Sequence, residues 1–381
     1  MRCLPFLLAL AMVPAAAVAK PAPSAANAQQ NTLWVQSGES ILLKKAGIAF
    51  PSKPGGLSIS GTKEFSHEGE GVDAAVQYSS PDEQVYATAY LFFPGLAHTG
   101  LAAWATDNAI RTGSPSLVGG GDMRIANAAG VRNGAVRADY SNYRNGQASS
   151  AAFFKAGHWL VKLRVSGPEA RKQEVESAMA ALLDGIQVPK ATTVYPASQL
   201  SIAPCPEGEG SSGARMLADL AASEKLAEAF LGTFDGAGIE AKVDGTQQTT
   251  VLPSRVPPAF CRSEGVVVGD AHIPVLRSVD AAPEAVDGRT RLIVILSDSG
   301  SMLELAHLPS FNRYVLLHHD IGGTAILSGW DGVPSDAQIA GWFSGADKEA
   351  TRTRAIVRHS PGKADSIEIA APPAAPAAPI S

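Results

Sequence analysis

The chain has 381 residues, of which 45% are hydrophobic and 18% charged, and its formal net charge is −5. This composition is ordinary for a globular protein with enough apolar residues to build hydrophobic cores. The slight acidic excess argues against a nucleic-acid-binding protein, which needs a basic face, so we expect no nucleic-acid partner. At about 150 residues for each domain, the length allows two domains.

Residues 1–19 have the pattern of a secretory signal peptide. Arg2 supplies the positive end, an apolar run follows, and the small residues Ala17 and Ala19 fit a cleavage site after Ala19. The run is shorter than the roughly 20 apolar residues that cross a bilayer as a helix. Cys3 precedes the apolar run, which argues against a lipoprotein. We therefore expect a soluble mature protein, periplasmic or secreted, without a transmembrane segment.

Composition divides the rest of the chain into five parts. Residues at both ends are rich in Pro, Ala, Asn or Gln without apolar periodicity, which indicates flexible segments. A proline-bounded stretch after a helix-like segment interrupts the middle. The expected parts are a flexible leader (20–31), a first α+β domain (32–190), a linker (191–198), a second α+β domain (199–358) and a disordered Pro/Ala-rich tail (359–381).

The first domain has an alternating pattern of strand and helix signals. In chain order we expect strands at 72–79 and 84–93, a helix at 101–112, and strands at 131–143, 147–155 and 158–165. Asn145-Gly146 predicts a tight hairpin turn between the strands at 131–143 and 147–155, because both positions tolerate positive φ. Ser166 is the expected cap of a following amphipathic helix with Pro168 in its first turn.

This order of elements resembles the PsbP/Mog1-like α/β/α fold over roughly residues 45–188. The resemblance rests on AGIAFP (46–51) as an opening strand, on the helix in the middle, and on HWLVKLRVSGPEA (158–170) before an amphipathic helix. It implies an antiparallel sheet with packed helices and a role as a non-catalytic partner or assembly factor. It assigns no binding residue to this chain.

The second domain is expected to be α+β as well, with an antiparallel sheet. An amphipathic pattern with Ser212 as its cap predicts a helix over 213–234. Strands are expected at 266–268, 273–279, 291–297, 314–319 and 324–328, the last two as a hairpin around Gly322-Gly323. Ser335 and Gln338 form the sequence pattern of a capping box, which predicts a short helix that carries Ile339, Trp342 and Phe343.

Two cysteines, Cys205 and Cys261, remain after signal cleavage. In an exported chain they are expected to pair as a structural disulfide, because their separation does not match a Cys-x-x-Cys redox motif. On the chain-entropy model, closing a loop of that size stabilises the fold by about 4 kcal/mol.

One segment carries candidate catalytic residues. Ser299 and Ser301 follow an apolar strand, and His318, His319 and Asp320 could supply a base and its orienting carboxylate if the strands are neighbours. Adjacent histidines on a strand face opposite ways, so one at most serves a given site. The alternative interpretation has His318 packed or hydrogen-bonded on one face and His319 solvated on the other.

The same segment, residues 297–302, also resembles the metal-site motif of von Willebrand A domains. Ser297 stands where that motif has its leading Asp, which removes the charged member of a metal site. A turn between strands explains the segment better. Residues 67–70 (His-Glu-Gly-Glu) offer possible metal ligands, but a solvated acidic turn is the favoured interpretation, and we expect neither a metal nor a cofactor.

Trp330 is the candidate binding residue, because it lies in an expected loop between Gly329 and Asp331. Trp104, Trp159 and Trp342 fall on predicted apolar faces and are expected in the core. The leading hypothesis is a non-catalytic binding or assembly factor of the bacterial envelope with a protein or small-ligand partner. The alternatives are a periplasmic serine hydrolase that uses the segment above, and a structural envelope component that uses its Pro/Ala tail.

Overall fold

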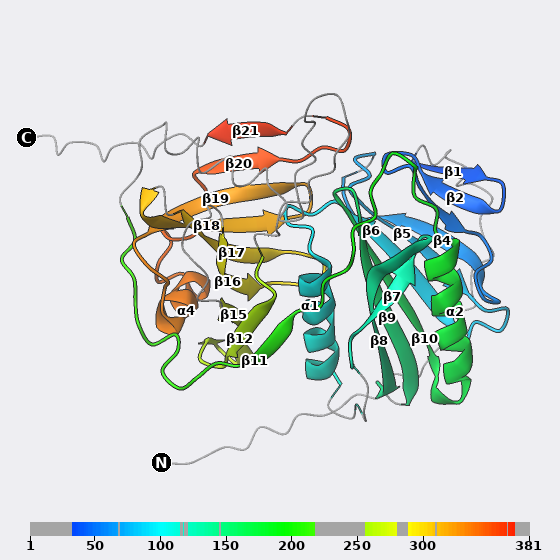
Figure 1. Cartoon of the computed structure of the whole chain (residues 1–381), viewed down its shortest axis with the longest axis horizontal. Helices are drawn as coiled ribbons and strands as arrows, with labels where there is room; N and C mark the ends of the chain where they lie inside the picture. Colours follow the sequence, from blue (N-terminus) through cyan, green and yellow to red (C-terminus); the bar gives the residue numbers. More distant parts are fainter. Residues whose placement is uncertain are drawn as a thin grey trace, which may run out of the picture. The chain divides into compact units, whose positions relative to one another are not determined.

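The computed structural model describes residues 33–67, 69–114, 117, 121–144, 146–217, 256–279, 289–308, 311–363 and 365–369. Their strands form sheets of three, seven, nine and two strands, and helices are few (Figure 1). All strand pairs are antiparallel except one. The predicted α+β class with antiparallel sheets is therefore confirmed. No helix in the described ranges has the length and apolar character needed to cross a bilayer.

A three-stranded meander opens the described chain. It consists of β1 (Trp34–Ser37), β2 (Ser40–Leu43) and β3 (Ile48–Pro51). The expected opening strand at 46–51 is thus the third strand of this meander. The two strands before it were not predicted, because they are short and carry little periodicity. Leu43, Ile48 and Phe50 are fully buried against the core of the next sheet.

The seven-stranded sheet contains the strands predicted for the first α+β region after the opening strand at 46–51. Its order is β4-β5-β6-β10-β9-β8-β7. The members are β4 (Ser58–Glu64), β5 (Asp73–Ser79), β6 (Tyr86–Phe92), β7 (Arg124–Ala128), β8 (Val131–Tyr143), β9 (Gln147–Ala156) and β10 (Trp159–Pro168). The β8–β9–β10 meander agrees with the prediction within a few residues.

Two helices flank this sheet, α1 (Thr99–Thr112) and α2 (Lys172–Gly185), and a short 3₁₀ turn η1 (Glu169–Arg171) precedes α2. The predicted cap Ser166 is wrong. β10 continues through Ser166, whose hydroxyl lies 2.8 Å from that of Ser149 on β9 and is thus used within the sheet.

The nine-stranded sheet has the order β11-β12-β15-β16-β17-β18-β19-β20-β21. Its members are β11 (Ser201–Pro204), β12 (Ala259–Ser263), β15 (Val275–Ser278), β16 (Arg289–Ile295), β17 (Met302–Leu308), β18 (Arg313–Asp320), β19 (Gly323–Trp330), β20 (Ala355–Arg358) and β21 (Ser366–Ile369). A small hairpin, β13 (Val267–Val268) with β14 (Ala271–His272), and helix α4 (Asp336–Ser344) accompany it. The predicted capping box of Ser335 and Gln338 is present at the start of α4.

Two expectations about this region are corrected. The helix predicted over 213–234 does not begin at Gly213, because Met216 is extended and pairs with Trp330 at the end of β19; residues 218–234 lie outside the described residues. The expected disordered tail does not begin at 359, because Ser366–Ile369 pairs with β20 as the edge strand β21. In both cases pairing with a distant strand outweighs the local pattern.

Helix α1 lies between the two large sheets (Figure 1). Ala102, Ala103 and Ile110 pack on β8 and β9 in one apolar cluster. Leu101 and Ala105 pack in another cluster against β12, β15, β16 and β17 of the nine-stranded sheet. The helix is therefore buried on two faces, as expected for a helix that is apolar over most of its surface.

The described residues, which begin at Leu33, belong to one compact unit. The expected linker, 191–198, is hydrogen-bonded along the first sheet: Val194 pairs with Ala156, and the amide of Ala197 donates to the carbonyl of Asn133 at 2.8 Å. The two predicted α+β regions correspond to the two large sheets, and α1 supplies apolar surface to both.

The predicted disulfide between Cys205 and Cys261 is confirmed. Cys261 lies in β12 and Cys205 directly follows β11, and these two strands form the one parallel pair of the described strands. Their Cα atoms are 4.6 Å apart, and 56 positions separate them in sequence. The bond thus closes a long loop at the edge of the nine-stranded sheet.

Candidate binding pocket at the joint between the sheets

The two large sheets are joined where β6 ends and the β18–β19 hairpin turns. The amide of Gly95 donates to the carbonyl of Asp320, and the amide of Gly322 donates to the carbonyl of Phe93, each at 2.8 Å. A Cβ on Gly95 would lie 2.4 Å from the carbonyl oxygen of Gly323, so this close approach of two backbones requires glycine.

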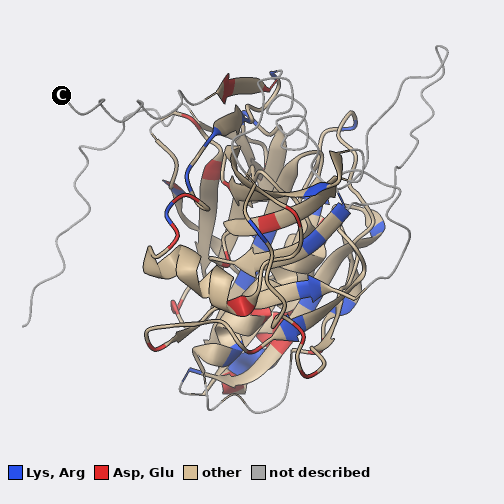
Figure 2. Ribbon diagram, turned by 90° about the vertical axis from the view of Figure 1, so that its left-hand side faces the viewer, with Lys and Arg blue, Asp and Glu red and all other residues tan. Residues whose placement is uncertain are grey.

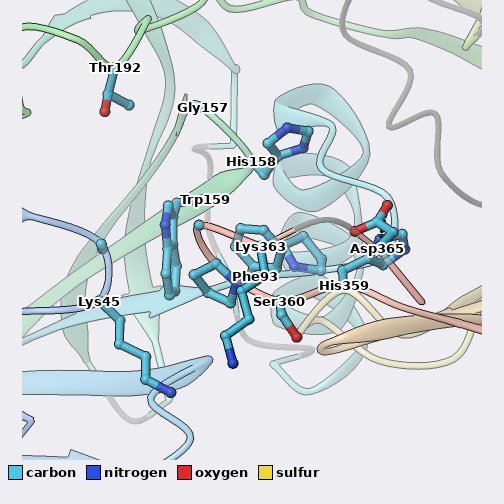
Figure 3. Close-up of a pocket in the computed structure, with 15 residues that line it drawn as sticks. Lys45, Phe93, Gly157, His158, Trp159, Thr192, His359, Ser360, Lys363 and Asp365 are labelled. Atoms are coloured by element: carbon cyan, nitrogen blue, oxygen red, sulfur yellow. Dashed lines mark ion pairs between the residues drawn. The ribbon is translucent and has the colours of Figure 1, made fainter.

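A pocket of about 510 Å³ opens beside this joint. Five separate segments line it: the β2–β3 turn, the exit of β6, the β9–β10 turn, Thr192 after α2, and the β20–β21 turn. Figure 3 shows the side chains from these segments that face the pocket. Its volume lies in the range of pockets that hold small molecules.

Two aromatic rings form the apolar wall of the pocket. The rings of Phe93 and Trp159 meet edge to face with centroids 5.0 Å apart, and the ring of His158 lies 5.9 Å from that of Phe93. Phe93 and Trp159 are 8% and 5% exposed, so the surrounding strands hold both rings in place. Such a wall offers a ligand an apolar surface whose shape is set before binding.

On the opposite side, His359 and Asp365 form an ion pair from the two ends of the β20–β21 turn. His359 Nδ1 lies 3.0 Å from the Asp365 carboxylate, and His359 Nε2 lies 3.3 Å from the hydroxyl of Thr324 (Figure 3). Both ring nitrogens of His359 are thus engaged, which fixes the ring orientation.

Beyond Thr324 the hydrogen bonds continue into the interior. The Thr324 hydroxyl lies 3.0 Å from His319 Nδ1, His319 Nε2 lies 2.7 Å from the Glu304 carboxylate, and the Thr290 hydroxyl donates to Glu304 at 2.5 Å. All four of these residues are 0% exposed. The pocket wall is therefore continuous with a buried polar network, which ties its position to the rigid sheet.

Two lysines add positive charge to the pocket. Lys45 comes from the β2–β3 turn and Lys363 from the β20–β21 turn, and both side chains are exposed. Lys45 Nζ donates to the carbonyl of Glu70, which uses one of its three hydrogens. The carboxylate of Asp365 is engaged by His359, and within the described residues no carboxylate pairs with either lysine. Figure 2 shows the Lys and Arg residues in blue and the Asp and Glu residues in red along the described ribbon.

The predicted catalytic residues are only partly brought together. Ser301 Oγ lies 3.2 Å from His318 Nε2, as a nucleophile and its base would. Within the described contacts, however, no carboxylate approaches His318 Nδ1, and the carboxylate of Asp320 accepts the amide of Ile321 instead. Ser299 bonds to Ser297 within the same turn.

The expectation that His319 is solvated is wrong. His319 points to the opposite face of β18 from His318, as the strand geometry requires, but that face is buried there and the ring is bonded to Glu304 and Thr324. The histidine that has a carboxylate partner is thus not the histidine that reaches a serine.

The segment 297–302 forms the turn between β16 and β17, in agreement with the favoured interpretation. Asp298 makes an ion pair of 2.7 Å with Lys162 on β10 of the other sheet. Within the described residues no group of three acidic, histidine or cysteine side chains could hold a metal ion. Glu64 accepts the amides of Gly69 and Gly71, which holds the turn that contains His67 and Glu70.

The placement of Trp330 in an exposed loop is also wrong. Trp330 is the last residue of β19, is 1% exposed and packs against Trp342 of α4 with ring centroids 5.8 Å apart. Its Nε1 donates to the Ser328 hydroxyl at 2.8 Å. Gly329 beside it suggested a loop, but Gly329 belongs to the end of β19.

Sequence reasoning missed the residues of the pocket. His359, Lys363 and Asp365 were placed in a disordered tail, and Lys45 carried no motif. The available signal was Pro361-Gly362, a turn dipeptide between two short β-prone runs, which is typical of a hairpin. Only the pairing of β20 with β19 brings that turn to the exit of β6.

No protein-family model matches this chain, and a search of the curated proteins found no match.

Proposed function

We propose that this protein is an exported, non-catalytic binding or assembly factor of the bacterial envelope, and that its ligand or partner group occupies the pocket beside Phe93 and Trp159. The single observation that carries the proposal is the pocket of about 510 Å³, to which five segments far apart in sequence contribute. Its apolar wall and its fixed polar wall are both held by buried contacts, which is the arrangement of a preformed ligand site.

Two sequence features support the cellular part of the proposal. The pattern of residues 1–19 favours export, and the Cys205–Cys261 disulfide suits an oxidising compartment. The non-catalytic part of the proposal comes from the sequence resemblance of residues 45–188 to the PsbP/Mog1-like fold, whose members commonly act without catalysis.

The hydrolase alternative has one observation in its favour, the 3.2 Å contact between Ser301 and His318. A serine nucleophile of this type needs a base whose second nitrogen is oriented by a third group. In this chain the oriented histidine, His319, lies on the other face of the strand. The geometry therefore favours binding over acyl transfer.

The test uses the mature chain and a Ser360→Trp variant, in which an indole fills the pocket. Ser360 lines the pocket, and the backbone bond from Lys363 to its carbonyl does not need its hydroxyl (Figure 3). Each protein is incubated with envelope extract, washed and denatured, and the released molecules are identified by mass spectrometry. We expect a molecule or peptide that wild type retains and the variant does not.

A fluorophosphonate probe, which labels nucleophilic serines, tests the hydrolase alternative on the same preparations. Wild type should remain unlabelled, as should a Ser301→Ala control. Labelling of wild type that disappears in Ser301→Ala would replace the binding proposal with the hydrolase. Equal retention of every molecule by wild type and Ser360→Trp would remove the pocket as the binding site.

A further inference from the structure

We infer that the pocket binds a small organic anion, with its carboxylate or phosphate group held by Lys45 and Lys363 and its apolar body against Phe93 and Trp159. This inference rests on the proposed function and specifies the chemical class of the ligand. It follows from three properties of the lining: the balance of charges, the placement of the aromatic rings, and the rigidity of the acidic side of the pocket.

The balance of charges is positive on the side of the lysines. Of the lining residues, Lys45 and Lys363 are cationic and Asp365 is the acid. Asp365 is already paired with His359 at 3.0 Å, and Arg358 just before the turn is paired with Glu368 at 3.1 Å. The lining thus has two ammonium groups against one carboxylate, and that carboxylate already lies 3.0 Å from His359 Nδ1, so an entering ligand meets an excess of positive charge in the described lining.

The hydrogen-bonding capacity of the lysines fits an anion with several acceptor oxygens. An ammonium group has three donors, and Lys45 uses one on the carbonyl of Glu70. That bond places Lys45 without neutralising its charge. In Figure 3 the ends of Lys45 and Lys363 lie on the same side of the aromatic pair. A carboxylate or phosphate on that side gains charge-assisted hydrogen bonds from both.

The aromatic wall determines what is attached to the anionic group. Phe93 and Trp159 present ring surface between the lysines and His158 (Figure 3). A fully hydrated ion such as free phosphate makes no use of this surface, whereas an aromatic or branched aliphatic body removes it from water. The volume of about 510 Å³ accommodates such a body together with its charged group.

The far wall offers its carboxylate in a fixed position. The Asp365 carboxylate is held by His359, which is held in turn by the buried Thr324. A cationic ligand would face the repulsion of two lysines against this one carboxylate. The lysines therefore favour anions over cations in this pocket.

The experiment measures binding of three probes to the mature protein by isothermal titration calorimetry at low and high NaCl. The probes are 1-naphthylacetate, 1-naphthyl phosphate and the uncharged 1-naphthylacetamide. We expect at least one anion to bind about tenfold or more tightly than the amide, and its affinity to fall with salt. Whichever of the two anions binds with the higher affinity shows whether the pocket prefers a carboxylate or a phosphate group.

The variants Lys45→Met and Lys363→Met should each weaken the anion about tenfold and leave the amide unchanged. Lys363→Arg should keep most of the affinity, and Lys348→Met, an exposed lysine beyond α4, should change nothing. All four lysine changes are at exposed positions, so circular dichroism and thermal melting should match wild type.

The Ser360→Trp variant distinguishes failure of the pocket as the binding site from failure of the anionic ligand class. If Ser360→Trp abolishes binding but neither lysine variant weakens it, the pocket is the binding site and the anionic class is wrong. If none of these variants affects binding, both the pocket and the class are wrong. Failure of both anions to bind better than the amide overturns the anionic class alone.

Discussion

Burial determines which groups the candidate catalytic residues of this chain can contact, whatever the local sequence pattern suggests. His319 is one of the candidate catalytic residues, yet it and Glu304 are both 0% exposed and form a bonded pair in the interior. Leaving one member of such a pair without its partner is costly, because a buried polar group then loses its hydrogen bond. These two residues therefore serve the sheet and hold the pocket wall through Thr324.

Asp73 is expected to make the stability of the protein depend on pH. It lies at the start of β5, where burial first and the charge of Asp320 second raise the pKa of its carboxyl from 3.8 to about 6. The folded chain thus binds this proton more tightly than the unfolded chain. The resulting stability is present below about pH 3.8 and is lost as the pH rises through about 6.

We predict that Asp73→Asn raises the free energy of unfolding at about pH 7.5 by about 1–2 kcal/mol, after allowance for solvent screening of this partly buried group. The variant should also lose the decline in stability between about pH 4 and pH 7. Urea unfolding at several pH values measures both effects. Asp270→Asn, at an exposed turn, is the control and should follow wild type. A parallel pH profile for Asp73→Asn and wild type would contradict the prediction.

The elements at the sheet edges and between the sheets depend on partners far away in sequence. Helix α1 has apolar residues on two faces, because each face meets a different sheet. At the β11 edge of the nine-stranded sheet, β11 and β12 form a short parallel pair. The disulfide directly after β11 links it to β12. Short edge strands contribute few hydrogen bonds, so a covalent link has a large effect there.

We predict that removing the disulfide with Cys205→Ala and Cys261→Ala together lowers the free energy of unfolding by up to about 4 kcal/mol, since the closed loop spans 56 positions. Denaturant unfolding of wild type with and without a reductant, alongside the double variant, measures this loss. The reductant should have no effect on the double variant. Ready reaction of both cysteines with a thiol reagent in unreduced wild type would count against the bond.

At the scale of the whole described chain, the two large sheets are linked by the apolar faces of α1, by backbone hydrogen bonds and by the ion pair of Lys162 with Asp298. Lys162 on β10 is 8% exposed and reaches both the carboxylate and the carbonyl of Asp298 in the β16–β17 turn. Burial, the larger cause, lowers the pKa of Lys162, and the charge of Asp298 opposes it. The ion pair thus makes the charge of a buried lysine tolerable and couples the two sheets.

We predict that Asp298→Asn destabilises the protein by about 1–3 kcal/mol, because it leaves the Lys162 ammonium buried without its counter-charge. Adding Lys162→Met should recover part of that loss, so the two changes should not be additive. Denaturant unfolding of the four proteins gives the coupling. The exposed pair Arg358–Glu368 is the matched control, and its double-mutant cycle should give a much weaker coupling, because solvent screens both side chains. Equal coupling in the two cycles would contradict the prediction.

The sequence by itself determined the features that depend on neighbouring residues: the β8–β10 meander, the capping box at Ser335 and the α+β class. Only the tertiary structure shows which side chains are buried and which distant segments pair. It buried Trp330 and His319, drew Ser366–Ile369 into an edge strand, and brought Lys45, Phe93 and His359 from three distant segments to one pocket. The physical reason is that turns and caps are stabilised within a few residues, whereas burial and sites arise from contacts between segments that no local pattern encodes.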